Sequence, residues 1–183
     1  MTADAAASAD KPASRRGRSG PSGKSGKSGK AGKAGFTVSL KGRALRLLSG
    51  REYSRTELER KLAPHEETPG QLAGVLDELQ AKDFISEARV VESVINRRSA
   101  RFGAARIRHE LLNKGLDATR VADAVLALKE TELARARDIW QRRFGTPAAD
   151  ARERARQARF LMARGFSGEI VRRVLRAGFD EEN

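Results

Sequence analysis

The feature that most constrains the fold of this chain is an internal repeat with a period of about fifty residues. The two clearest copies share a basic residue, a glycine and a large apolar residue, followed by three apolar positions at helical spacing. They are Lys114-Gly115-Leu116 with Val121, Ala124 and Val125, and Arg164-Gly165-Phe166 with Val171, Val174 and Leu175. A fainter copy keeps the register one period earlier, at Leu72, Val75, Leu76 and Leu79. Stacked copies of a small unit present a long, shallow surface and lack the single deep pocket that catalysis favours.

Apolar residues after residue 35 recur at helical spacing, and the sequence suggests no strand. Each unit is expected to contain one long helix and two shorter ones. Ser54 and Glu57 have the spacing of a capping box, and Asp117 and Ser167 are expected to cap later helices. Thr68-Pro69 and Thr146-Pro147 each predict a helix start with proline at the first helical position. Gly115 and Gly165 are expected to end helices.

The expected fold class is therefore all-α, with three tandem three-helix repeats in an elongated, curved arrangement after a basic tail. The repeats are expected at residues 36–83, 84–130 and 131–179, and the tail at residues 1–35. The tail is rich in Gly, Ser and Lys and has no periodic apolar face, so disorder is expected. Two interpretations of the tail remain open. Its regularly spaced lysines could form a row of charges that attracts DNA phosphates weakly, or the tail could be only a solvated linker. These lysines are Lys24, Lys27, Lys30 and Lys33.

Composition excludes several classes of protein. The chain has 183 residues, a net charge of +13 and no cysteine. Disulfide and thiolate chemistry are thus excluded, and the charge favours a polyanionic partner such as nucleic acid. The tail at residues 1–35 has no apolar signal segment, and no apolar run reaches the roughly 20 residues of a membrane span. A cytoplasmic protein without membrane contact is expected.

Catalysis is not indicated by the residues. The two histidines, His65 and His109, lie in different units and suggest neither a metal site nor an acid–base pair. Gly23-Lys24-Ser25 resembles the end of a phosphate-binding loop but joins no strand to a helix. Trp140 lies on an apolar helix face, where a core position is favoured over stacking on a base. No enzyme activity, metal or cofactor is predicted.

Arginines concentrate in the second and third repeats and are the candidate binding residues. The second-repeat cluster is Arg97, Arg98, Arg101, Arg106, Arg108 and Lys114. The third-repeat cluster is Arg142, Arg143, Arg156, Arg159 and Arg164, together with Arg154. Such groups bind phosphates or acidic protein residues. Alternatively, they form solvated helix faces that pair weakly with Glu110 or Glu153.

The segment from Arg98 to Leu116, Arg-Ser-Ala-Arg-Phe-Gly-Ala-Ala-Arg-Ile-Arg-His-Glu-Leu-Leu-Asn-Lys-Gly-Leu, closely resembles the signature of the RecX family, the bacterial regulators of the RecA recombinase. The run from Ser54 to Leu62 resembles that family's first repeat, and Arg164-Gly165-Phe166-Ser167 resembles its third. One departure is Asp83-Phe84-Ile85-Ser86-Glu87, where the family usually has glycine, an aromatic residue, leucine and two aspartates. The resemblance implies three tandem three-helix repeats that lie along a RecA filament on DNA.

Together, these features predict that the protein is a non-enzymatic modulator of RecA, mainly an inhibitor. It is expected to bind RecA filaments, to contact single- and double-stranded DNA weakly and without sequence preference, and to act as a monomer. Strand exchange, recombination and SOS activity would be limited as a result. The alternative is a basic helical DNA-binding protein with no dedicated protein partner.

Overall fold

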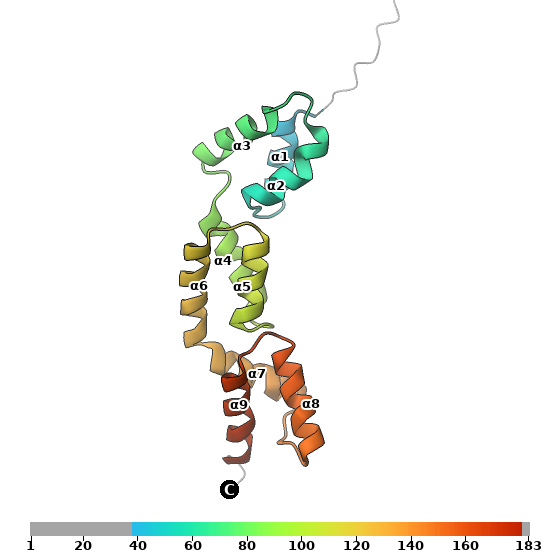
Figure 1. The fold of residues 1–183 in the computed structure, drawn as a ribbon, viewed down its shortest axis with the longest axis vertical. Helices are drawn as coiled ribbons and strands as arrows, with labels where there is room; N and C mark the ends of the chain where they lie inside the picture. Colours follow the sequence, from blue (N-terminus) through green and yellow to red (C-terminus); the bar gives the residue numbers. More distant parts are fainter. Residues whose placement is uncertain (1–37, 181–183) are drawn as a thin grey trace, which may run out of the picture. The chain divides into compact units, whose positions relative to one another are not determined.

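In a computed structural model, residues 38–180 are described, and within that range the chain is helical with no strand (Figure 1). This confirms the all-α prediction for the described part of the chain. The expectations for the tail, including Lys24, Lys27, Lys30 and Lys33, lie outside the described residues. No helix between residues 38 and 180 is long and apolar enough to cross a membrane.

The first group of helices comprises α1 (Leu40–Leu48), α2 (Arg55–Leu62) and α3 (Gln71–Ala81), with a short 3-10 turn at Ala63–His65. Their apolar faces meet in one core, which includes Leu58, Leu76 and Leu79, all 0% exposed. Ile85, from the segment that follows α3, is buried in the same core. Burial of one such side chain stabilises the fold by about 1.5 to 3 kcal/mol, so this core holds the three helices together.

The second group comprises α4 (Glu87–Arg98), α5 (Ala104–Asn113) and α6 (Ala118–Glu130). Val94, Ile107, Leu111 and Val121 are buried in its core. Since the apolar residues of each helix recur every three or four positions, all three helices turn one face inward and leave the other charged.

The third group comprises α7 (Glu132–Arg143), α8 (Ala151–Met162) and α9 (Gly168–Asp180). Trp140 is buried in its core, which confirms the predicted core position. Its indole Nε1 donates a hydrogen bond to Oε1 of Gln157 at 2.8 Å, so the polar atom of the buried ring has a partner. The residue therefore offers no free ring for stacking on a base.

Several of the predicted helix ends are confirmed. Ser54 and Glu57 form the capping box of α2, Asp117 caps α6, and the Ser167 hydroxyl accepts a hydrogen bond from Ile170 N at 3.3 Å. Gly115 and Gly165 have φ of +74° and +83°, the left-handed conformation that glycine adopts without a Cβ penalty.

Other predicted ends are wrong. Pro69 is not the first residue of α3, because Gly70 has φ of +84° and occupies the capping position, so the helix begins at Gln71. Pro147 does not start α8, since the Asp150 side chain accepts the Glu153 amide at 2.7 Å and the helix begins after Asp150. At α8 the side-chain cap of Asp150 sets the helix start, whereas at α3 the left-handed Gly70 does so without a side-chain cap.

Candidate anion-binding surface

Arginines from the second and third helix groups meet around one open hollow of about 600 Å³, here called the arginine hollow. It is formed by the segment between α4 and α5, by the end of α7, and by the end of α8 with the turn that follows it. Its lining residues are Ala100, Arg101, Phe102, Ile139, Arg142, Arg143, Phe160 and Arg164. The two arginine clusters that look separate in the sequence thus contribute to one surface.

A backbone contact brings these segments together. The Gly103 amide donates a hydrogen bond to the carbonyl of Arg164 at 2.9 Å. A Cβ added to Gly165 would lie 2.6 Å from the Cβ of Arg106, so the turn packs against the first residues of α5 without space for a side chain. Arg101 and Phe102, next to Gly103, therefore face the hollow beside the Arg164 turn.

Two aromatic rings support guanidinium groups at the hollow. The Arg164 guanidinium lies over the ring of Phe160, 3.5 Å from its centroid, and that of Arg106 lies over Phe102 at 4.6 Å. Phe160 also meets Phe144 edge to face, with centroids 5.1 Å apart. A guanidinium held flat on a ring is partly ordered, so it loses less side-chain entropy when it binds an anion. Neither ring is among the site residues predicted from sequence, although each lies four residues before its arginine, a spacing at which helical side chains meet.

Electrostatics at the hollow are unbalanced. Burial is the largest cause that lowers the pKa of Arg164, and the positive charges of Arg143 and Arg106 lower it further. Among residues 38–176, whose side chains are described, neither Arg164 nor Arg106 forms an ion pair with a carboxylate. An anion placed here would gain from several charges already held close together.

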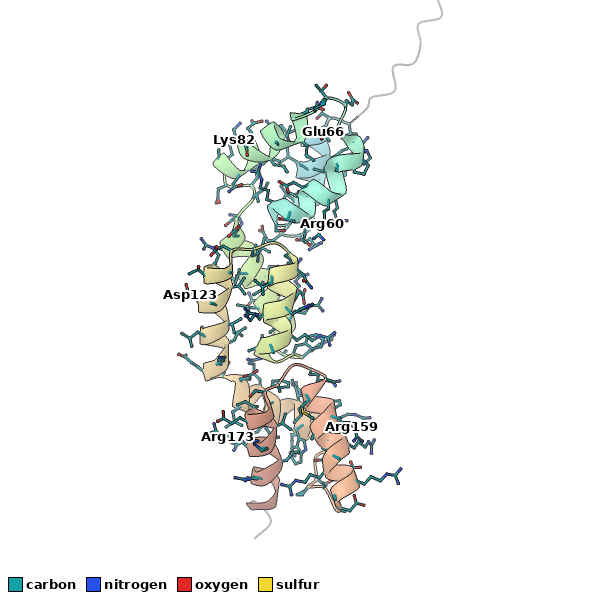
Figure 2. All side chains as sticks on the ribbon, viewed as in Figure 1. Arg60, Glu66, Lys82, Asp123, Arg159 and Arg173 are labelled. Carbon is teal, nitrogen blue, oxygen red and sulfur yellow. The ribbon has the colours of Figure 1, made fainter. Side chains whose placement is uncertain are left out.

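Most other candidate arginines are exposed, and some have acidic partners. Arg98 pairs with Glu110 at 3.0 Å and Arg156 pairs with Glu153 at 3.2 Å. These two ion pairs agree with the alternative interpretation, in which the arginines form solvated helix faces. Exposed pairs of this kind contribute about 0 to 1 kcal/mol, so they leave both side chains available to a partner. Arg97, Arg108 and Arg159 are exposed, and Arg159 extends from α8 as Figure 2 shows.

Lys114 has a different environment from the rest of its cluster. Its ammonium lies 2.7 Å from Oε1 of Glu57, and both side chains are only 12% exposed. The Ser54 hydroxyl donates a hydrogen bond to the Lys114 carbonyl at 2.5 Å. This residue thus connects α2 with the turn after α5, and we do not include it in the proposed binding surface.

Metal-ligating side chains and the two histidines are alternative candidates for site residues. No group of three or more His, Cys, Asp or Glu side chains between residues 38 and 176 is arranged to hold a metal ion. The imidazole Nδ1 of His109 lies 3.1 Å from the amide nitrogen of Asn113, one helical turn away on the exposed side of α5. The arrangement can bind anions by charge and hydrogen bonding.

Two family models match the chain, both from RecX: its first three-helix domain matches residues 41–79, and its third matches residues 130–175. The chain is 60% identical to "Regulatory protein RecX" of Leptothrix cholodnii over 146 residues, which are 80% of this chain and 93% of that protein. It is 48% identical to "Regulatory protein RecX" of Herminiimonas arsenicoxydans, covering 80% of this chain and 97% of that protein.

The fold also resembles a solved structure. The crystal structure of RecX from Lactobacillus salivarius superimposes with a TM-score of 0.65 at 19% identity, covering 75% of this chain and 93% of that one. At this identity the likeness concerns the fold alone. Taken with the sequence relatives, which cover most of both chains, it leads to one conclusion: the chain belongs to the RecX family of regulatory proteins.

Proposed function

We propose that this protein regulates the RecA recombinase, mainly as an inhibitor, by binding RecA filaments on DNA and limiting strand exchange, recombination and SOS activity. The observation that carries the proposal is the meeting of Arg101, Arg142, Arg143 and Arg164 at one hollow in a chain of the RecX family. Guanidinium groups bind carboxylates and phosphates in a planar, two-bonded geometry. A protein filament assembled on DNA presents both groups.

The proposal involves no catalytic step and no cofactor. We expect a cytoplasmic monomer that contacts single- and double-stranded DNA weakly. Sequence preference is not expected, because its arginines would bind phosphates rather than the edges of bases. Arg97, Arg108 and Arg159 would extend the binding surface beyond the hollow, because all three are exposed. Binding at filament ends would need far fewer molecules than RecA subunits, whereas coating of a groove would need comparable amounts.

A second candidate function is direct DNA binding without a dedicated protein partner. The net charge of +13 and the regularly spaced lysines of the first 35 residues favour it. In that case the protein would reduce RecA activity only by occupying the DNA.

The test that separates the two functions measures RecA-dependent ATP hydrolysis and filament length on single-stranded DNA, with and without this protein. We expect both to fall, and the effect to persist when an excess of RecA-free single-stranded DNA is added. Relief in proportion to the added DNA would support simple competition for DNA and contradict the proposal. When arginines of the hollow are changed to glutamate in this assay, a chain carrying Arg172→Glu and Arg173→Glu provides the matched control, because both residues are exposed on α9 outside the hollow.

A further inference from the structure

The chain contains two internal junctions built on the same plan. In each, the residue that precedes the second helix of one group donates a hydrogen bond to the carbonyl of a basic residue in the next group. The Ser54 hydroxyl bonds Lys114 O at 2.5 Å, and the Gly103 amide bonds Arg164 O at 2.9 Å. We call these the first and the second junction. Residues at the same place in both can be compared directly.

The resemblance extends to how closely the two sides approach. The glycine after each basic residue has positive φ, +74° at Gly115 and +83° at Gly165. A Cβ on Gly115 would lie 2.8 Å from the Cβ of Thr56, and one on Gly165 would lie 2.6 Å from the Cβ of Arg106. Each turn therefore packs directly on the first turn of the helix opposite, so a charge on that helix faces the basic residue.

The two junctions differ in that charge. The third residue of α2 is Glu57 and the third residue of α8 is Glu153, whereas the third residue of α5 is Arg106. An acidic residue at this place is favoured by the partial positive charge of the helix start, and a cation is disfavoured. Arg106 thus breaks a local rule that the other two helices follow. Such departures mark functional sites more often than structural ones.

At the first junction the charges are satisfied within the chain. Oε1 of Glu57 lies 2.7 Å from the Lys114 ammonium and 3.2 Å from a guanidinium nitrogen of Arg51. Burial raises the pKa of Glu57, but hydrogen bonds from Lys114 and the Ser54 backbone outweigh it, so the pKa lies below its usual value. The carboxylate is held in its charged form between two cations.

At the second junction a carboxylate also caps the helix start, since Oε1 of Glu132 accepts a hydrogen bond from the Ala104 amide at 2.7 Å, but this carboxylate pairs with neither Arg106 nor Arg164. Arg106 donates a hydrogen bond to the carbonyl of Ala163 at 3.2 Å, and Arg164 donates one to the carbonyl of Phe160 at 3.2 Å. Both partners are neutral, and no acidic side chain of residues 38–176 pairs with either arginine. Arg143 lines the arginine hollow together with Arg164 and adds a third positive charge.

We propose that Arg106, Arg143 and Arg164 bind a carboxylate from an acidic segment of a protein partner, which supplies at the second junction the charge that Glu57 supplies at the first. This inference rests on the proposed function, because the partner is the protein on which the chain acts. Arg143 and Arg164 line the arginine hollow together with Ile139 and Phe102, and the Arg106 guanidinium lies over the Phe102 ring. A segment that combines acidic and apolar side chains fits this mixture of arginines and apolar walls.

A protein carboxylate is favoured over single-stranded DNA because the aromatic rings at the site are already covered. Strong binding of single strands relies on bases stacked on uncovered aromatic faces. The rings of Phe102 and Phe160 already carry the guanidinium groups of Arg106 and Arg164, and Phe160 also contacts Phe144. A base would have to displace these contacts, whereas a carboxylate needs no free ring face.

The variant Arg106→Glu tests the inference because it places a carboxylate where the first junction has one. We expect it to pair with Arg164, to raise the midpoint of thermal unfolding, and to weaken binding of an external carboxylate at least roughly ten-fold. The neutral variant Arg106→Gln should bind with intermediate affinity and unfold at an intermediate temperature. Arg173→Glu, an exposed change of equal charge on α9, should leave binding nearly unchanged.

The probe is a short capped peptide of alternating leucine and glutamate, compared with the same peptide carrying glutamine and with oligothymidylate. Affinities come from fluorescence anisotropy with the full chain, and the arginine Nε–H signals in NMR spectra report which side chains respond. We expect the glutamate peptide to bind best and to shift the signals of Arg106 and Arg164. Equal binding of the peptide by Arg106→Glu and the unmodified chain would overturn the inference, as would a preference of these arginines for oligothymidylate.

These outcomes can be told apart from failure of the proposed function. If the glutamate peptide binds through Arg106 but the protein leaves RecA activity unchanged, the proposed function fails and the carboxylate site stands. If the protein inhibits RecA while Arg106→Glu inhibits equally and the peptide does not bind, the carboxylate site is refuted and the proposed function stands.

Discussion

Gly165→Ala should destabilise the protein much more than Gly70→Ala, although both glycines have nearly the same backbone conformation. Their φ values are +83° and +84°. An alanine in this left-handed region costs about 1 to 2 kcal/mol of strain, and the lower entropy of the unfolded alanine chain offsets about 0.4 to 1 kcal/mol of that. The backbone contribution should therefore be about 1 kcal/mol at both positions.

The surroundings of the two glycines differ. A Cβ on Gly70 would meet nothing within 4 Å, while one on Gly165 would lie 2.6 Å from the Cβ and 2.7 Å from the backbone nitrogen of Arg106. The turn must shift to relieve these contacts, which weakens the hydrogen bond from Gly103 N to Arg164 O, worth about 1 kcal/mol. With the added loss of packing, Gly165→Ala should cost about 3 kcal/mol in total.

The measurement is urea unfolding followed by circular dichroism and by fluorescence of Trp140, which is buried in the third core. In thermal unfolding each kcal/mol should lower the midpoint by about 2 to 4 °C for a chain of this size. Gly165→Ala should therefore lower it by several degrees more than Gly70→Ala. Equal effects of the two substitutions would refute the close packing of the second junction.

Three further predictions concern the core, the first junction and the tail. Leu76→Asp should abolish cooperative unfolding of the first helix group, because a carboxylate would be buried at a position that is 0% exposed; native-like circular dichroism and melting would contradict this core. Glu57→Gln should destabilise the protein at pH 7, where Glu57 is ionised and paired with Lys114. Because the folded pKa of Glu57 is lowered, the stability difference from the unmodified protein is fully present above pH 4.5 and should shrink as the pH falls through the folded pKa, as urea unfolding at several pH values will measure. Deletion of residues 1–35 should change the free energy of unfolding by less than about 0.5 kcal/mol and weaken binding to bare DNA at low salt; a loss of cooperative unfolding would show that the tail belongs to the fold.

Local chemistry made much of the fold predictable from sequence. Ser54, Asp117 and Ser167 cap helices as expected, because their short polar side chains reach amides within the next three residues. The apolar spacing also identified the inward faces, including that of Trp140. Pro69 and Pro147 misled the prediction of helix starts, since proline is equally compatible with the turn before a helix.

The candidate site was predictable only in part. Arginine clusters are visible in the sequence, but the meeting of Arg101 with Arg142 at one hollow depends on the contact between Gly103 and the Arg164 turn, which joins residues far apart in the chain. The ion pair of Lys114 with Glu57 arises from a similar long-range contact. Helical periodicity describes each helix separately, so it carries no information about which charges face each other across a junction.

The central claim is that the arginine hollow acts on RecA, and strand exchange by RecA in the presence of charge-reversed protein tests it most directly. Arg101→Glu combined with Arg142→Glu changes two exposed hollow residues that form no ion pair with side chains of residues 38–176. Like charges would then oppose the anions that the hollow binds, so we expect roughly ten-fold or greater loss of inhibition with unchanged circular dichroism. The control pair Arg172→Glu and Arg173→Glu should inhibit like the unmodified protein. Full inhibition by the hollow variant, or equal loss in both variants, would contradict the account.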